Sequence, residues 1–157
     1  MTIIERKIVW GDLDSLGIVF YPRYYEWMDE ASHHFFDSMG LNLVKLWKEK
    51  GLIFGLIETG CKYLSPGRYG DMIHLETRLD KLEAKTLTLN HTIYRMPGKE
   101  LMVEGFERRV CLDVCDPMEF KAIKIPREIQ AILEGGAAKG PSSTRASSLS
   151  GPSGPGR

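Results

Sequence analysis

The sequence has few of the features that mark a disulfide-stabilised, metal-binding or membrane-spanning protein. Its 157 residues include three cysteines, Cys61, Cys111 and Cys115, an odd number without a CxxC pair. This argues against a disulfide framework and against a zinc site, so we expect free thiols and no metal. No apolar run is long enough to cross a membrane, and the chain does not open on an apolar signal segment. The sequence therefore predicts a cytoplasmic protein with no membrane partner.

The chain also lacks an excess of charge of either sign. Its 21 basic residues balance 21 acidic ones, and the sequence pI is near 6.9. A neutral chain has no long-range attraction for nucleic acid or for an anionic membrane surface. We therefore expect no nucleic-acid partner, and an anionic ligand would have to be held by local contacts.

The most informative stretch is residues 11–24, Gly-Asp-Leu-Asp-Ser-Leu-Gly-Ile-Val-Phe-Tyr-Pro-Arg-Tyr. Asp12 and Asp14 lie in a loop before Pro22, which suits the first position of a helix because its missing N–H would have no intrahelical partner there. A helix start carries unpaired backbone N–H groups and partial positive charge. A nearby carboxylate can attack a carbonyl or activate water while those N–H groups hold the oxyanion. The alternative is a loop carboxylate that only accepts backbone hydrogen bonds.

The hydrophobic pattern predicts one folded domain, residues 1–134, of the α+β class. Apolar residues recur at helical spacing along 22–39, over so much of the helix circumference that the helix needs to be wrapped by other elements. We expect strands at 3–10, 53–63, 73–80, 87–94, 101–114 and 122–125, with helices at 41–50 and 126–133. Gly105 is a candidate bulge position in its strand. Residues 135–157 are rich in Gly, Ala, Ser and Pro, which predicts a disordered tail.

Residues 11–24 closely resemble the active-site motif of hotdog-fold acyl-CoA thioesterases, in particular the 4-hydroxybenzoyl-CoA thioesterase branch. The branch pattern is Gly-Asp-x-Asp-x-x-Gly-x-Val-x-Tyr-x-x-Tyr. The likeness continues at 69–71, around His91 and at 122–126, so it covers roughly residues 4–133. The resemblance implies a hotdog fold, in which a curved antiparallel sheet wraps around a long central helix. It also implies a homo-oligomer, either a dimer with a continuous sheet or a homotetramer built from two such dimers.

The resemblance further implies hydrolysis of an acyl-CoA to CoA and a free acid, without a cofactor. Asp14 matches the family's nucleophile or general base, and the backbone N–H of Tyr21 would polarise the thioester carbonyl. Burial against Trp10 or Phe20 would make the carboxylate more reactive. The family's basic cluster for the nucleotide phosphates is represented here only by Lys85 and Thr86.

Other chemistry remains open from the sequence. His33 and His34 are adjacent, so they point about 100° apart on a helix and do not chelate one metal together. His91 lies on the apolar face of a strand, typical of a core histidine. A hydratase or dehydratase of acyl thioesters would use His74 or His91 with an acidic residue. A hotdog protein that binds acyl-CoA without turnover is the third possibility, and the sequence does not indicate which acyl group is bound.

Overall fold

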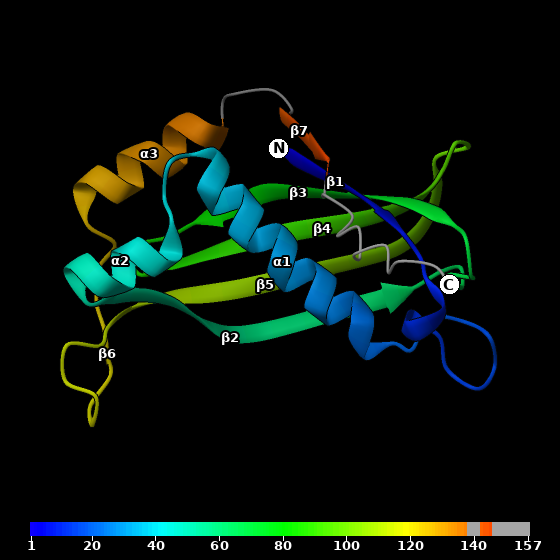
Figure 1. The fold of residues 1–157 in the computed structure, drawn as a ribbon. Coiled ribbons are helices and arrows are strands. Elements are labelled where there is room, and N and C mark those ends of the chain that lie inside the picture. Colours follow the sequence, from blue (N-terminus) through cyan, green and yellow to red (C-terminus); the bar gives the residue numbers. More distant parts are fainter. Residues whose placement is uncertain (138–141, 146–157) are drawn as a thin grey trace, which may run out of the picture.

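The structure is a computed structural model, and it describes residues 1–137 and 142–145. Figure 1 shows the arrangement of its helices and strands. In chain order these are β1 (Thr2–Lys7), the short 3₁₀ helix η1 (Trp10–Asp12), α1 (Pro22–Ser38), α2 (Leu43–Lys50), β2 (Leu52–Tyr63), β3 (Met72–Leu82), β4 (Thr86–Met96), β5 (Glu100–Asp113), β6 (Lys121–Ala122), α3 (Arg127–Ala137) and β7 (Ser142–Arg145).

The strands form one sheet in the order β2-β5-β4-β3-β1-β7, with β6 paired to the end of β5. Every pairing is antiparallel except that of β1 with β7. The long helix α1 lies across one face of the curved sheet (Figure 1). This confirms the predicted α+β class with a long central helix. Within the described residues, none of the helices has both the length and the apolarity to span a membrane.

Helix α1 forms where the apolar pattern predicted it and contributes side chains to both parts of the core. Pro22 occupies the first helical turn, and the chain leaves the helix through Gly40, whose φ of +75° favours glycine. One cluster of buried side chains joins the first half of α1 to β1, β3 and β4, and a second joins its last turns to α2 and α3. The side chains buried from α1 are Tyr24, Trp27, Met28, Ala31, Ser32, Phe35 and Phe36.

Gly105 does not mark a bulge, contrary to our expectation. It pairs regularly with His91, and the register shift between β4 and β5 falls between Ile93 and Tyr94, opposite 101–103. A Cβ at position 105 would lie 2.4 Å from the Met28 sulfur. Glycine is therefore required here because α1 packs directly on the β5 backbone.

The C-terminal part differs from the predicted tail at two places. Helix α3 continues to Ala137, and Ser142–Arg145 pair in parallel with β1. Backbone hydrogen bonding to the free edge of β1 explains the second difference, because such pairing does not require apolar side chains. The remainder of the predicted tail, residues 138–141 and 146–157, lies outside the described residues.

A buried polar network fastens α1 to the sheet. Glu107 on β5 is 2% exposed and accepts hydrogen bonds from the Ser32 hydroxyl of α1 and from Arg109, whose Nη2 lies 2.9 Å from Glu107 Oε2. The Arg109 guanidinium also donates to Asp29 of α1 at 2.6 Å and to the Phe54 carbonyl of β2 at 3.2 Å. One buried ion pair thus joins the helix to two neighbouring strands.

His91 completes this network from β4. It is 1% exposed, and its Nδ1 lies 2.9 Å from the Thr77 hydroxyl on β3, while its Nε2 lies 3.8 Å from Glu107 Oε2. Burial alone would raise the pKa of Glu107, but His91, the charge of Arg109 and the Ser32 hydroxyl together lower that pKa to about 2. Glu107 is therefore ionised in the folded protein throughout the physiological pH range.

We predict that Glu107→Gln lowers the free energy of unfolding by about 3 kcal/mol at pH 7, because it leaves Arg109 without its most buried partner. The carboxylate stabilises the fold above its ordinary pKa of 4.5, and this contribution is lost as the pH falls from there toward about 2. Urea unfolding of both proteins should show their difference shrinking over that pH interval. Glu104→Gln, at an exposed position of the same strand, is the matched control and should change little. A pH-independent difference would contradict the assignment to the Glu107 charge.

Candidate active site

The loop between η1 and α1 is built around Asp12. This side chain is buried, and its Oδ2 accepts a hydrogen bond from the Val9 N–H at 2.9 Å. Its backbone carbonyl accepts from the Phe20 N–H at 2.9 Å, and its Oδ1 lies 4.0 Å from Nε of Arg23. Asp12 therefore holds both ends of the loop together, and each of its carboxylate oxygens has a partner within the chain.

Asp14 lies at the turn of the same loop and is half-buried. Its backbone N–H donates to the Ile18 carbonyl at 2.8 Å, and its carbonyl accepts from Gly17 at 3.0 Å, where φ is +73°. The Leu16 N–H donates to Oδ1 of Asp14 at 2.8 Å. The other carboxylate oxygen, Oδ2, takes part in none of the hydrogen bonds or ion pairs among residues 1–137. The turn thus binds Oδ1 of the carboxylate and leaves Oδ2 without a partner among these residues.

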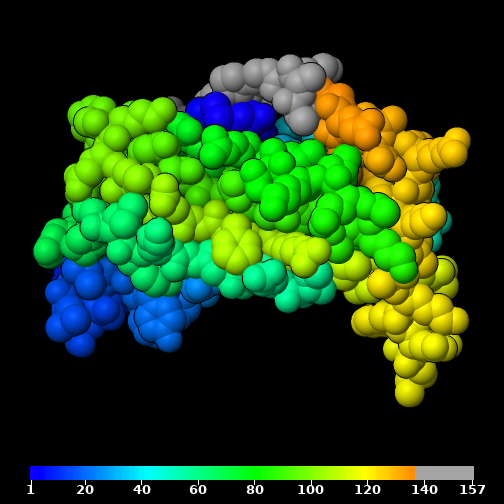
Figure 2. Space-filling model, turned by 180° about the vertical axis from the view of Figure 1, so that it is seen from behind, coloured from blue at the N-terminus to red at the C-terminus, as the bar shows by residue number. Residues whose placement is uncertain are grey.

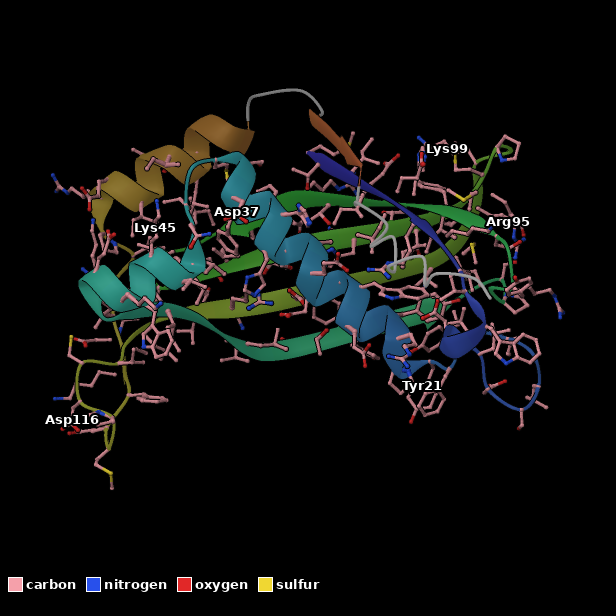
Figure 3. All side chains as sticks on the ribbon, in the orientation of Figure 1. Tyr21, Asp37, Lys45, Arg95, Lys99 and Asp116 are labelled. Carbon is pink, nitrogen blue, oxygen red and sulfur yellow. The ribbon has the colours of Figure 1, made fainter. Side chains whose placement is uncertain are left out.

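The start of α1 offers one open backbone donor close to this turn. The Arg23 N–H donates to the Phe20 carbonyl at 2.9 Å, and Pro22 has no N–H. The Tyr21 N–H takes part in none of the backbone hydrogen bonds within the described part of the chain. The bridge between Leu13 and Val19 closes the turn that holds Asp14, and Tyr21 follows two residues after this bridge. Figure 3 shows Tyr21 at this end of α1, with its ring directed outward.

The aromatic residues around the loop do not bury Asp14 within one chain. Trp10 is 77% exposed and contacts Tyr69 edge-on, with ring centroids 6.1 Å apart. Phe20 is 47% exposed and Tyr21 is 60% exposed. A single chain thus leaves both of the rings expected to desolvate the carboxylate, Trp10 and Phe20, largely exposed, with Asp14 half-buried.

Lys85 and Thr86 lie far from Asp14 in the same chain. The Asp14 loop contacts the Met72 end of β3 through the bridge between Ile18 and Arg68, whereas Lys85 follows the other end of that strand. The eleven residues of β3 span about 33 Å. Lys85 Nζ donates to the Ala122 carbonyl at 3.2 Å, and the Thr86 hydroxyl donates to Glu83 at 2.6 Å. One chain therefore does not bring the predicted phosphate contacts to the predicted catalytic residues.

A hollow of about 920 Å³ lies on the face of the sheet that points away from α1. It includes Thr88, Asn90 and Thr92, which alternate along β4 with the buried core residues. Figure 2 views the molecule from behind, where this sheet face is exposed. Asp14 and Tyr21 are outside this hollow and outside a smaller one near α3. Among the described residues, no group of three or more His, Cys, Asp and Glu side chains is placed to hold a metal ion.

Comparison with known proteins identifies the family. The model of the thioesterase-like superfamily matches residues 8–133. The 4-hydroxybenzoyl-CoA thioesterase of Pseudomonas sp. strain CBS-3 is 27% identical over 133 residues, which cover 80% of this chain and 92% of the relative. Two solved structures are similar in fold and sequence. The gentisyl-coenzyme A thioesterase BH1999 has a TM-score of 0.73 and 29% identity, covering 83% of this chain and 98% of the other. An aspartate-to-asparagine mutant of 4-hydroxybenzoyl-CoA thioesterase, complexed with 4-hydroxybenzoyl-CoA, has a TM-score of 0.77 and 26% identity, covering 83% and 96%.

The curved sheet around α1, with a carboxylate loop at the helix start, places the protein among the hotdog-fold thioester hydrolases. More closely, the chain belongs to the thioesterase-like superfamily and to its 4-hydroxybenzoyl-CoA thioesterase-like branch. The resemblance seen in residues 11–24 is thereby confirmed, as is the hotdog fold.

We predict different consequences for the two loop carboxylates. Asp12→Ala removes the buried acceptor of the Val9 N–H and should lower the free energy of unfolding by about 1–2 kcal/mol. Asp14→Asn keeps an acceptor for the Leu16 N–H and should change the stability by less than about 0.5 kcal/mol. Urea unfolding monitored by tryptophan fluorescence measures both. Equal losses would contradict the division into one structural and one available carboxylate.

Proposed function

We propose that the protein is an acyl-CoA thioesterase in which Asp14 is the catalytic carboxylate and the Tyr21 amide is the oxyanion donor. The observation that carries this proposal is that the short segment from Asp14 to Tyr21 holds both a carboxylate oxygen and a backbone N–H that are unused among the described residues. The family membership supports it, since the thioesterases named above act on CoA thioesters.

The proposed reaction begins with the thioester oxygen accepting a hydrogen bond from the Tyr21 N–H. Asp14 then attacks the carbonyl carbon, or it takes a proton from a water molecule that attacks in its place. In either case the C–S bond breaks, CoA leaves as a thiolate that takes up a proton, and water supplies the oxygen of the free acid. Negative charge on the carbonyl oxygen develops beside the positive end of the α1 dipole, which stabilises the transition state.

The two alternative functions have less support from the structure. A hydratase would need its histidine and acidic residue at a cleft, but His91 and Glu107 are 1% and 2% exposed beneath α1. His74, the other candidate, lies 3.3 Å from Glu5 across the β1–β3 pair, where the two side chains are already partners of each other. A non-catalytic acyl-CoA-binding protein would not require an unused carboxylate oxygen beside the helix start.

Replacement of Asp14 by Asn tests the mechanism. We expect kcat for a good acyl-CoA substrate to fall at least 100-fold, about the lower end of what a positioned acid or base contributes, with KM nearly unchanged. A panel of CoA thioesters, assayed by release of free thiol, provides the measurement and identifies the acyl group. Asp37→Asn, at the opposite end of α1 (Figure 3), is the control and should keep wild-type turnover. Wild-type turnover by Asp14→Asn would remove this residue from the mechanism.

We also propose that the active form is a homo-oligomer assembled through β2. This twelve-residue strand ends the sheet, pairs only with β5 among the described strands, and exposes Leu56 and Ile57 to 48% and 52%. A long apolar edge of this kind is a template for pairing with another chain. Antiparallel pairing of two β2 strands places the Lys85 end of one copy near the Asp14 end of the other. Lys85 and Thr86 could then contact the nucleotide phosphates across the dimer, and two such dimers would form the homotetramer.

Ile57→Lys tests this assembly. Two lysines facing each other across paired β2 strands should convert the oligomer to a monomer, and hydrolysis should be lost with it. Size-exclusion chromatography with light scattering measures the state, and the thiol-release assay measures the activity. Ile132→Lys, an equivalent change on α3, should leave both unchanged. A wild-type protein that is monomeric and active at assay concentration would overturn the proposed assembly.

A further inference from the structure

The loop between β5 and β6, residues 114–120, has no role in the proposed function as described so far. We call it the projecting loop. Its Met118 is 91% exposed and its Phe120 is 59% exposed, although both are large and apolar. Figures 1 and 2, which view the molecule from opposite sides, both show this loop extending beyond the β2 edge.

The projecting loop is held in a defined shape by its own hydrogen bonds. The Val114 N–H donates to the Gly51 carbonyl at 2.8 Å, which ties the loop to the start of β2. The Cys115 N–H donates to the Asp113 carboxylate and the Met118 N–H to the Asp116 carboxylate, each at 2.9 Å. Met118 is therefore presented to solvent by a turn with fixed geometry.

The loop and the candidate active site flank the free edge of β2 at its two ends. Asp116 marks the projecting loop beside the start of the strand, and Tyr21 marks the helix start beside its end (Figure 3). In Figure 2 the corresponding regions, coloured yellow and blue, both extend past the β2 edge and leave an indented margin between them. The projections thus stand on either side of the surface where a second copy would pair.

Two-fold symmetry exchanges these two ends. An axis normal to the sheet, placed just outside the free edge of β2 and level with its middle, pairs the strand with its copy. If residue i of one chain then faces residue j of the other, residue j of the first chain faces residue i of the second. The projecting loop of each copy then lies beside the Asp14 loop and the α1 start of its partner. There it meets exposed apolar side chains on the other copy: Leu16, Phe20, Tyr21, Tyr63 and Leu64.

We propose that the projecting loop of each subunit closes the acyl-thioester site of the other subunit, with Met118 and Phe120 as its apolar wall. This inference rests on the proposed function and identifies what completes that site. In a single chain Asp14 is half-exposed, and Tyr21 is 60% exposed with no backbone acceptor for its N–H among the described residues, so water competes with the thioester oxygen for that donor. An apolar wall from the partner removes this competing water and limits the size of the acyl group.

Subunit mixing tests whether the loop acts on the other copy. Met118→Asp should lower kcat/KM at least 10-fold, because it places a second carboxylate beside Asp14 and admits water. Asp14→Asn should be inactive because it lacks the proposed catalytic carboxylate. After exchange of equal amounts of the two variants, half of the dimers are mixed, and each mixed dimer contains one site with both Asp14 and Met118 intact. Activity should therefore rise to about a quarter of the wild-type value per chain.

The outcomes of this mixing experiment separate the possibilities. A mixture whose activity stays at the mean of its two parents would show that the loop does not act across subunits and would overturn the inference. Wild-type kcat/KM in a dimeric Met118→Asp protein would also overturn the inference. Ile132→Asp, which introduces the same charge on α3, is the matched control. It should have wild-type activity without mixing with a second variant.

Cross-linking gives a second readout that does not depend on catalysis. In a Cys115→Ser background, Met118→Cys in one chain and Leu16→Cys in the other should form a disulfide between subunits on oxidation, whereas Ile132→Cys with Leu16→Cys should not. A cross-link in a protein that hydrolyses none of the thioesters would refute the proposed function and leave the contact intact. Hydrolysis that depends on Asp14, without a cross-link or a gain on mixing, would refute the contact alone.

Discussion

The fold depends on the buried ion pair between Glu107 and Arg109. These side chains lie beneath α1, where an unpaired charge would be strongly destabilising, and each is satisfied by groups from other elements. Ser32 and Asp29 supply the partners from the helix, so rotation or sliding of α1 would break several hydrogen bonds at once. Apolar packing alone would leave this register less specific. The helix start, which carries the Tyr21 amide, belongs to the helix that this buried contact fixes on the sheet.

Much of this architecture could be predicted from the sequence because it follows from local patterns. The apolar stripe of α1 and the strands expected at 73–80 and 87–94 each correspond to an observed element. The buried network was missed, although its signal was present: Glu107 and Arg109 alternate in phase with the inward-facing Val103 and Cys111 on β5. Charged residues at such positions are ordinarily interpreted as solvent-exposed, and only the tertiary structure shows the groups that compensate them.

The candidate site could be predicted only in part, for a different physical reason. The loop of Asp12 and Asp14 is local in sequence, so its residues could be identified from their order alone. The distance from Asp14 to Lys85 is set by the length of β3, and the exposure of Trp10 and Phe20 is set by what the rest of the chain leaves uncovered. Neither property is encoded in the spacing of the motif. Both are understandable if the catalytic surroundings are shared between two copies of the chain.

Pro22 has a consequence for the stereochemistry of the proposed reaction. Because Pro22 follows Tyr21 and carries no N–H, the helix start would present a single amide, rather than a pair, to the thioester oxygen in the proposed reaction. One donor fixes the direction of the carbonyl bond but leaves the carbonyl plane free to rotate about it. The groups that bind the acyl chain and the pantetheine arm must then determine which face of the thioester carbonyl is turned toward Asp14. Substrate selection and facial selection would therefore be two results of the same contacts.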